Sequence, residues 1–385
     1  MYGVLLLAYS MNAADRQLFP LLAHDVRVQY GFSLSDTGLL TTIFTLGLAV
    51  AGLPTGYLLA RFSRKTVLLL GIAIFSAGTA LTVLARGFPD MLFYLAATGI
   101  GEAMQLTVMI AIAANYFVGY RAAAIGSMNV FFGLGAFSGP ILGGVLLTSY
   151  KSWHAPMITF GIVGVLMIAI ISLTVQPWFS ETHRAADARA DVRGASTLLN
   201  RNTIILTVLS AIGGLVFFGF TGMYPTYLRE ALHYSPKAAG FVISFYGAGA
   251  LLSILGGWLG DRFPPRIVLG GAYFSLAALG YLCFHGSEAA ATKAIFTFAY
   301  GAIGSGVAYV NLAAYHVKAV RSQLSSRASG MFVTSVYAAA AAAGYLMGGI
   351  ASHVGWALAG EIQISLLAAI AGCLALSLRA DQMSL

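Results

Sequence analysis

Charged side chains are scarce in this chain: only 9% of its 385 residues are Asp, Glu, Lys or Arg, whereas 59% are hydrophobic. A soluble domain carries roughly 25% charged residues, so a soluble fold is excluded because too little polar surface would face water. The charges that exist are clustered, and the stretches between them reach roughly 20 apolar residues, enough to cross a bilayer core about 30 Å thick. The sequence therefore predicts an all-α, polytopic membrane protein.

Several chemical motifs are also missing. The two cysteines, Cys283 and Cys373, lie in apolar runs and show neither metal-ligand spacing nor a framework of pairs. No GxxxxGK[ST] nucleotide loop occurs, which argues against direct ATP-driven pumping, and the serines and histidines form no nucleophile motif. We therefore expect no enzyme activity, no cofactor and no metal site.

The basic residues gather between alternate apolar runs. Arg61, Arg64 and Lys65 fall in one short loop, and Lys318 and Arg321 fall in another. Because Lys and Arg favour cytoplasmic loops, this bias predicts that both termini are cytoplasmic. The net charge of +8 therefore sets orientation, and no nucleic-acid partner is expected. Short loops fit a bacterial inner (plasma) membrane. We predict twelve transmembrane helices, at 2–23, 36–60, 65–85, 90–117, 121–147, 154–177, 202–228, 237–260, 266–285, 291–315, 328–352 and 356–378.

One polar stretch, 178–201, interrupts the apolar runs with charges of both signs. It predicts a cytoplasmic linker between two six-helix bundles, 1–177 and 202–385. The halves are weakly similar, since GYLLARF at 56–62 aligns with GWLGDRF at 257–263. Two pseudo-symmetric six-helix units are typical of secondary transporters, which hold the substrate between the units near the membrane midplane.

The repeated segment carries a family resemblance. Residues 56–65, GYLLARFSRK, resemble the GxLxDRxGRK loop motif of the major facilitator superfamily, and residues 257–266 form its second copy. The resemblance implies the major facilitator fold and gating-loop roles for five residues: Arg61, Arg64, Lys65, Asp261 and Arg262. The first copy departs from the pattern, because Ala60 and Ser63 replace the usual Asp and Gly, so we expect lopsided gating contacts.

Two further segments narrow the resemblance. Residues 12–17, NAADRQ, look like the NxxDR signature of organic-anion:cation symporters and Spinster-type carriers, and residues 99–103, GIGEA, resemble a GxGEA stretch of the same groups. In those groups the matching acids are regarded as protonation sites and the Arg as an anion contact. The resemblance therefore implies that Asp15 and Glu102 carry protons and that Arg16 binds substrate. The Arg that many members place before the GxGEA stretch is Leu95 here.

The charges within apolar helices also point to this region on physical grounds. An ionised side chain at a membrane helix centre costs ~2.5–3.5 kcal/mol and usually faces the bundle interior. Asp15 and Arg16 are adjacent, so they point about 100° apart, whereas Asn12 shares the face of Arg16. Glu102 and Gln105 belong to a polar stripe that we expect to line a cavity.

Two interpretations of these charges are open. In one, Arg16 forms a structural ion pair that joins two helices. In the other, one cation serves the two acids, so an anionic substrate that competes for Arg16 leaves an acid ready to bind a proton. Proton and anion then bind together, which is symport.

The second half has aromatic and hydroxyl residues in place of buried charge. A lopsided site is therefore predicted, with charge recognition from the first half and apolar walls from the second. We interpret the protein as a proton-coupled carrier of a small organic anion, a carboxylate with an apolar or aromatic body, that works as a monomer in the lipid bilayer. The predicted substrate-binding residues are Arg16, Asn12, Gln105, Tyr224, Tyr246, Tyr309, Asn311 and Tyr337.

Three other functions compete with this interpretation. A Spinster-like carrier of lysolipids or other amphiphiles shares the same two segments, and a non-transporting receptor could share the fold. The third is drug efflux by proton antiport, since GAFSGPILGG at 135–144 is similar to a GxxxGPxxGG antiporter motif. Glycines four apart also permit close helix packing, which we favour as the reason for this segment.

Overall fold

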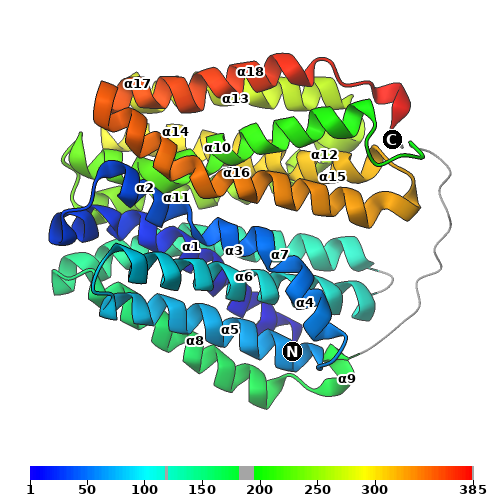
Figure 1. The fold of residues 1–385 in the computed structure, drawn as a ribbon, viewed down its shortest axis with the longest axis horizontal. Helices are drawn as coiled ribbons and strands as arrows, with labels where there is room; N and C mark the ends of the chain where they lie inside the picture. The colour runs from blue at the N-terminus through cyan, green and yellow to red at the C-terminus, as the bar shows by residue number, and fades with distance from the viewer. Residues whose placement is uncertain (118–119, 182–194, 384–385) are drawn as a thin grey trace.

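The computed structural model of the chain describes residues 1–117, 120–181 and 195–383, and helices joined by short turns make up most of these residues (Figure 1). The helices before the predicted linker are α1 (Tyr2–Tyr30), α2 (Leu34–Thr42), α3 (Phe44–Val50), α4 (Gly52–Leu59), α5 (Arg64–Leu81), η1 (Thr82–Leu84), α6 (Phe88–Tyr116), α7 (Arg121–Tyr150), α8 (His154–Thr174) and α9 (Pro177–Ser180).

The remaining helices follow the predicted linker. They are α10 (Arg201–Glu230), α11 (Pro236–Ala250), α12 (Ser253–Arg262), α13 (Pro265–His285), α14 (Ala290–Gly301), η3 (Ala302–Tyr309), α15 (Val310–Lys318), η4 (Ser322–Leu324), α16 (Ser325–Val354), α17 (Trp356–Gly360), η5 (Glu361–Leu366), α18 (Leu367–Ala375) and η6 (Ala380–Gln382). The segments η3 and η5 are π-helical, so two of the predicted spans contain a local change of helical pitch.

Within the described residues, ten helical stretches are long and apolar enough to cross a membrane. An eleventh apolar helix, Leu34–Val50, is shorter. Helix α1 has the length of a span, but Asn12, Asp15, Arg16 and Gln17 interrupt its apolar sequence. The prediction of an all-helical membrane protein is confirmed, whereas the count of twelve crossings stays a prediction.

The predicted span 36–60 is not continuous, because it breaks into α2, α3 and α4. Pro54 explains the second break: it has no backbone N–H to donate to the carbonyl of Val50, where α3 ends. The predicted span 237–260 also divides, between α11 and α12. These breaks bend the chain beside the interior of the molecule.

The helices before and after residue 200 form two groups that lie side by side (Figure 1). Both chain ends lie at one end of the molecule, which we call the terminal end; the turns after α1 and α7 lie at the other, which we call the opposite end. Helix α7 packs against α1 in its own group and α11 in the other, and α16 packs against α10 and α2. These two helices therefore join the groups.

Glycines allow this close packing. A Cβ atom on Gly135 would lie 1.8 Å from the carbonyl oxygen of Ser10, and one on Gly139 would lie 2.6 Å from that of Ala14. On the other side of α7, a Cβ atom on Gly240 would lie 2.3 Å from the carbonyl oxygen of Pro140. The glycines of segment 135–144 thus let α7 approach α1 and α11 backbone to backbone, which supports packing as their role.

The predicted linker, 178–201, is described only at its two ends, because residues 182–194 lie outside the described residues. At its start, the Glu181 carboxylate accepts hydrogen bonds from the backbone N–H groups of Arg64 (3.0 Å) and Lys65 (3.1 Å). Burial opposes ionisation of Glu181, but these hydrogen bonds outweigh it and hold the pKa of this carboxyl below its usual range. The loop between α4 and α5 is thereby fixed to the chain after α9.

Replacement of Gly135 by Ala should destabilise the protein, because the new methyl group has no room against α1. Overpacking of this kind costs about 1–3 kcal/mol, and thermal unfolding in detergent should show a lower midpoint. Gly126→Ala in the same helix is the matched control, since nothing lies within 4 Å of a Cβ atom there. Equal unfolding midpoints for the two variants would contradict the packing role of Gly135.

Candidate functional site

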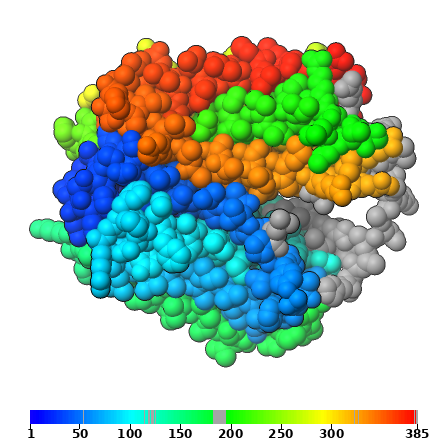
Figure 2. Space-filling view, viewed as in Figure 1, coloured from blue at the N-terminus to red at the C-terminus, as the bar shows by residue number. Residues whose placement is uncertain are grey.

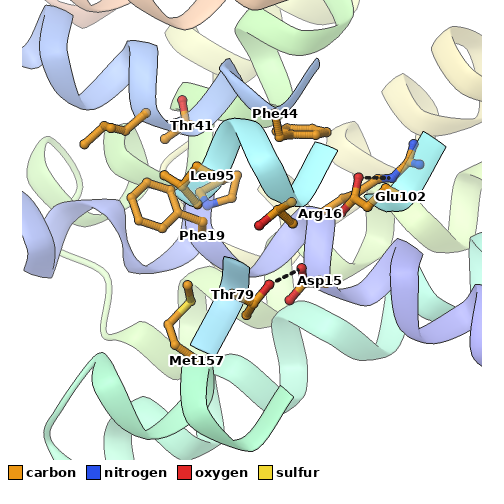
Figure 3. Close-up of a pocket in the computed structure, with 12 residues that line it drawn as sticks. Asp15, Arg16, Phe19, Thr41, Phe44, Thr79, Leu95, Glu102 and Met157 are labelled. Carbon is orange, nitrogen blue, oxygen red and sulfur yellow. Dashed lines mark hydrogen bonds and ion pairs between the residues drawn. The ribbon is translucent and has the colours of Figure 1, made fainter. Parts of the chain in front are cut away.

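Arg16 lies near the middle of α1 with its side chain almost fully buried. Its Nε–H donates a hydrogen bond to Asn12 Oδ1 at 2.9 Å, one helical turn earlier, as the shared face predicts. The same nitrogen lies 2.9 Å from Glu102 Oε2 on α6 (Figure 3). Asn12 in turn donates from Nδ2 to Gln105 Oε1 at 2.8 Å. Asn12 and Gln105 therefore hold Arg16 in place between α1 and α6.

The ion pair leaves Glu102 incompletely compensated. Glu102 is 1% exposed, and neither of its carboxylate oxygens accepts a hydrogen bond from the described residues. The single Nε–H of Arg16 is directed to Asn12, so its contact with Glu102 is ionic rather than hydrogen-bonded. A buried carboxylate normally requires both a counter-charge and hydrogen bonds, and a bound proton would remove much of that requirement.

Asp15 points to a different helix. Its Oδ2 accepts a hydrogen bond of 2.7 Å from Thr79 Oγ1 on α5 (Figure 3). Asp15 and Glu102 share a small pocket of about 20 Å³, enough for roughly one water molecule. The pocket is lined by Asp15, Arg16, Phe19, Pro20, Leu40, Thr41, Phe44, Thr79, Leu95, Thr98, Glu102 and Met157.

A second, larger cavity of about 470 Å³ lies between the two groups of helices. Arg16 lines both the cavity and the small pocket, whereas Asp15 and Glu102 line only the small pocket. The cavity is lined by Tyr9, Arg16, Gln17, Pro20, Thr41, Phe44, Leu48, Gly52, Ala103, Leu106, Thr107, Ile110, Asn129, Phe132, Phe217, Phe218, Thr221, Tyr246, Ala250, Ser253, Ser305, Tyr309, Val310, Ala313, Ser329, Phe332, Val333 and Tyr337.

The cavity extends toward the terminal end, because Ile110 and Ser329, which line it, lie in the parts of α6 and α16 nearest that end. At the opposite end α2 meets α16 closely: a Cβ atom on Gly38 would lie 1.9 Å from the carbonyl oxygen of Gly344. Figure 2 shows this contact, with α1 and α2 against α16 at the left. The structure is therefore closed at the opposite end.

Ion pairs between α1 and α10 reinforce this closure. Arg229 makes two hydrogen bonds to the Asp25 carboxylate, at 2.8 and 3.1 Å. Arg27 Nη1 lies 2.7 Å from Glu230 Oε1, and His24 Nδ1 lies 3.3 Å from the same oxygen. This network was not predicted from the sequence. A signal was present, because acidic and basic residues occur together at the ends of α1 and α10, the first helix of each half.

Three predicted residues of the second half line the cavity: Tyr246, Tyr309 and Tyr337. The hydroxyl groups of Tyr309 and Tyr337 are 2.8 Å apart and share one hydrogen bond. That bond uses one of the two O–H donors, so the pair keeps one donor for another partner. Their placement agrees with hydroxyl donors contributed by the second half.

Four predicted substrate-binding residues do not line the cavity, and here the prediction needs correction: Asn12 and Gln105, which hold Arg16, and Tyr224 and Asn311 of the second half. Tyr224 is fully buried, stacks on Phe220 with ring centroids 4.4 Å apart, and belongs to an aromatic cluster between helices. Asn311 donates from Nδ2 to the carbonyl oxygens of Gly256 (2.8 Å) and Val307 (2.9 Å), so it holds α15 against α12. The sequence placed both residues on the correct helices but could not determine which face of each helix meets the cavity.

Several cavity residues were not predicted from the sequence. Tyr9 lies seven residues before Arg16 and so on the same face of α1, a signal that could have been read. Gln17 adjoins Arg16, is largely buried, and its Oε1 has no hydrogen-bond partner among the described residues. Asn129 and Phe132 bring α7 into the site, and the Arg16 guanidinium lies 5.8 Å from the Phe132 ring centroid.

The predicted gating-loop residues make contacts near their own loops. The Arg61 guanidinium lies 4.3 Å from the ring centroid of Tyr57, and Arg262 lies 5.4 Å from that of Trp258. The Arg64 side chain donates a hydrogen bond to the carbonyl oxygen of Ser180 at 3.2 Å, and the Lys65 side chain donates one to that of Ser172 at 2.8 Å. Asp261 forms an ion pair with Lys318 at 2.7 Å. Their gating role stays a prediction.

Removal of the Asp25–Arg229 pair should loosen the opposite end. The test uses a protein without Cys283 and Cys373 in which Thr41→Cys provides the reporter cysteine. A membrane-impermeant maleimide is added on the side of the opposite end. We expect Asp25→Asn to raise the rate at which the reporter is labelled by roughly two- to tenfold. Asp90→Asn, an acid near the same end but outside the network, is the control. An unchanged labelling rate would show that the pair does not contribute to closure.

Known proteins resemble this chain in both sequence and fold. It is 25% identical over 313 residues to the cis,cis-muconate transport protein of Acinetobacter baylyi, covering 77% of this chain and 75% of that protein. It is 24% identical over 298 residues to the hexuronate transporter of Bacillus subtilis, covering 74% and 69%. The fold matches the crystal structure of a bacterial homologue of the human lysosomal transporter Spinster, inward-facing and occupied, with a TM-score of 0.74, 19% identity, and 97% and 95% of the two chains covered.

The same relationship appears at the level of the family. Residues 5–345 match the sequence profile of the Major Facilitator Superfamily, and this match covers most of the chain. The predicted relation to both organic-anion and Spinster-type carriers is confirmed by the relatives and the fold. This protein therefore belongs to the Major Facilitator Superfamily and is a membrane transporter rather than an enzyme.

Proposed function

We propose that this protein is a proton-coupled secondary active transporter of a small organic carboxylate. The observation that carries the proposal is the position of Arg16, which lines the cavity between the two groups of helices and pairs with the buried Glu102. The muconate and hexuronate transporters among its relatives are named for organic acids, which supports a carboxylate as the substrate.

We propose that the chain crosses the membrane twelve times. Helix α1 and the broken run α2–α4 would then join the ten long apolar helices, giving bundles at 1–177 and 202–385 joined by the linker 178–201. The terminal end would face the cytoplasm of a bacterial cell, because Arg61, Arg64 and Lys65 lie there. In this orientation the cavity opens inward, and we propose that the monomer exposes it alternately to the two sides.

Coupling follows from the two environments of Arg16. Arg16 lines the cavity, and its buried Nη2 has no hydrogen-bond partner among the described residues, so the guanidinium keeps a donor that we propose an anion in the cavity would use. A substrate carboxylate bound there competes with Glu102 for the same guanidinium. Glu102 then loses part of its only counter-charge and binds a proton more readily. Anion and proton therefore bind together, and each promotes binding of the other.

Asp15 is proposed as the second proton site. It shares the small pocket with Glu102, and roughly one water molecule fits there, so a proton could pass between the carboxylates without entering the cavity. The small pocket also separates the two acids from the substrate. The proton path and the substrate path would thus meet where Arg16, Pro20, Thr41 and Phe44 line both spaces, and Arg16 is the charged residue of that boundary.

The charge of the cavity distinguishes the competing functions. A cationic drug would face Arg16 without a carboxylate among the described lining residues, so drug efflux is disfavoured. A Spinster-like amphiphile carrier is the second candidate, because the second half contributes mainly apolar and aromatic lining residues.

A thermal-shift screen with carboxylates, lysolipids and cationic drugs separates these functions. Uptake into proteoliposomes with an imposed pH gradient separates a transporter from a receptor.

Glu102→Gln should abolish proton-driven uptake but preserve substrate exchange, because the amide keeps the shape of Glu102 and cannot titrate. Both activities are measured in proteoliposomes, uptake with an imposed pH gradient and exchange with substrate on both sides. Glu288→Gln, an exposed acid, is the control. Equal loss of uptake and exchange would instead favour a purely structural Arg16–Glu102 pair.

Arg16→Ala should remove binding of the anionic substrate. Loss of charge-assisted hydrogen bonds weakens affinity on the order of ten- to a hundredfold, and titration calorimetry in detergent can measure this change. Arg16→Lys should restore part of the affinity, since it keeps the charge but not the planar fork. Arg86→Ala, an exposed cation, is the control. Undiminished binding by a folded Arg16→Ala protein would contradict the anion hypothesis.

A further inference from the structure

We infer that the cavity selects a monocarboxylate with an apolar or aromatic body and rejects the dicarboxylate built on the same skeleton. This inference rests on the proposed function, because it takes an organic anion as the substrate. It goes further by fixing the number of carboxylates that the site can hold, and it rests on which residues line the cavity.

The cavity offers one positive charge. Among the lining residues that the structure describes, Arg16 alone carries a formal charge at neutral pH. The Arg16 guanidinium already pairs with Glu102, and the Nη2 of Arg16 has no hydrogen-bond partner among the described residues. One guanidinium that is shared in this way can neutralise one substrate carboxylate at most.

The second half provides nothing that could neutralise a second carboxylate. Its contribution to the cavity consists of aromatic rings, such as Phe217, Phe218 and Phe332, and of neutral hydroxyl groups. The paired hydroxyls of Tyr309 and Tyr337 keep one O–H donor, which suits a hydroxyl or carbonyl substituent. A second carboxylate at this wall would be a buried, unpaired charge, whereas a methyl group or a ring edge would pack against the phenyl rings.

Other basic residues of the described chain are held away from the cavity lining. Lys318 is ion-paired with Asp261, and Arg61 lies over the Tyr57 ring near the terminal end. The cations at the opposite end, Arg27 and Arg229, are paired with acids across the closed contact between α1 and α10. In this conformation a diacid therefore meets one cation, whichever way it is oriented.

The test compares acids that share a skeleton and differ in one carboxylate. Sorbate and trans,trans-muconate have the same six-carbon diene, which ends in a methyl group or in a second carboxylate; benzoate and terephthalate form a second pair. Binding to the full-length protein in detergent is measured by titration calorimetry at pH 7.5, where these carboxylates are ionised. We expect sorbate and benzoate to bind roughly tenfold or more tightly than their diacid partners.

A variant with an added cation provides the reciprocal test. Ser305 is a small, partly buried residue that lines the cavity from η3, so Ser305→Lys should strengthen muconate binding relative to sorbate. Ser305→Met is the matched control, because it adds similar length without charge. Thr221→Lys, from α10, is the second site if the first variant does not fold.

The outcomes separate this inference from the proposed function. If wild-type protein binds each diacid as tightly as its monoacid, the inference is overturned while an organic-anion transporter is retained. If Ser305→Lys and Thr221→Lys both fold and neither improves diacid binding over its neutral counterpart, the charge argument is overturned. If neither these four acids nor any other carboxylate of the screen binds, the proposed function fails and the inference with it.

Discussion

The contact between Arg16 and Glu102 is the constraint on which the site depends. Both side chains are almost fully buried in helices that are otherwise apolar, where an isolated charge of either sign would be costly. Pairing reduces that cost and fixes α1 against α6, and Asn12 and Gln105 set the orientation of the guanidinium. The pair is only partly satisfied, and the proposed function uses the remaining capacity of both partners: Arg16 for an anion and Glu102 for a proton.

Arg16, together with Pro20, Thr41 and Phe44, lies at the boundary between two compartments of the interior. The small pocket contains the two acids, and the cavity contains the aromatic and hydroxyl residues of the second half. In the proposed function, this separation would keep the carboxylates of the protein away from an anionic substrate, which they would otherwise repel. Asp15 accepts a hydrogen bond from Thr79, whereas Glu102 accepts none from the described residues, so the two acids have different environments although they share a pocket.

The two groups of helices meet through contacts of different kinds. Along α7 and α16 the glycines bring backbones together, and such packing tolerates small rotations of one helix against another. Between α1 and α10 the contacts include a partly exposed ion pair, Arg27 with Glu230, which costs less to break than a buried pair because water can replace the lost partner. Contacts of this kind suit an end of the molecule that has to open.

Much of the site could be predicted from the sequence because buried charge is so rare in this chain. Asp15, Arg16 and Glu102 are visible as exceptions within apolar runs, and the one-turn spacing of Asn12 and Arg16 determined their shared face. The same reasoning failed for residue types that are common in this chain. Aromatic side chains pack, face lipid or line cavities equally well, so Tyr224 was assigned to the cavity although it stacks on Phe220 between helices. Asn311 was assigned to the cavity too, although its side chain holds α15 against α12. Pro54 was visible, but its effect on the span around it was not anticipated.

The sequence by itself determined the membrane environment, the helical fold and the rare buried charges, because these follow from composition and local spacing, and it indicated the family through the resemblance of three short motifs. The tertiary structure decided which acid pairs with Arg16, that the acids lie apart from the larger cavity, and that α1 and α10 are joined by ion pairs at the opposite end. Those features depend on the rotation and register of helices that are distant in the chain, and no local pattern encodes them. The single positive charge of the cavity is likewise a property of the assembled lining.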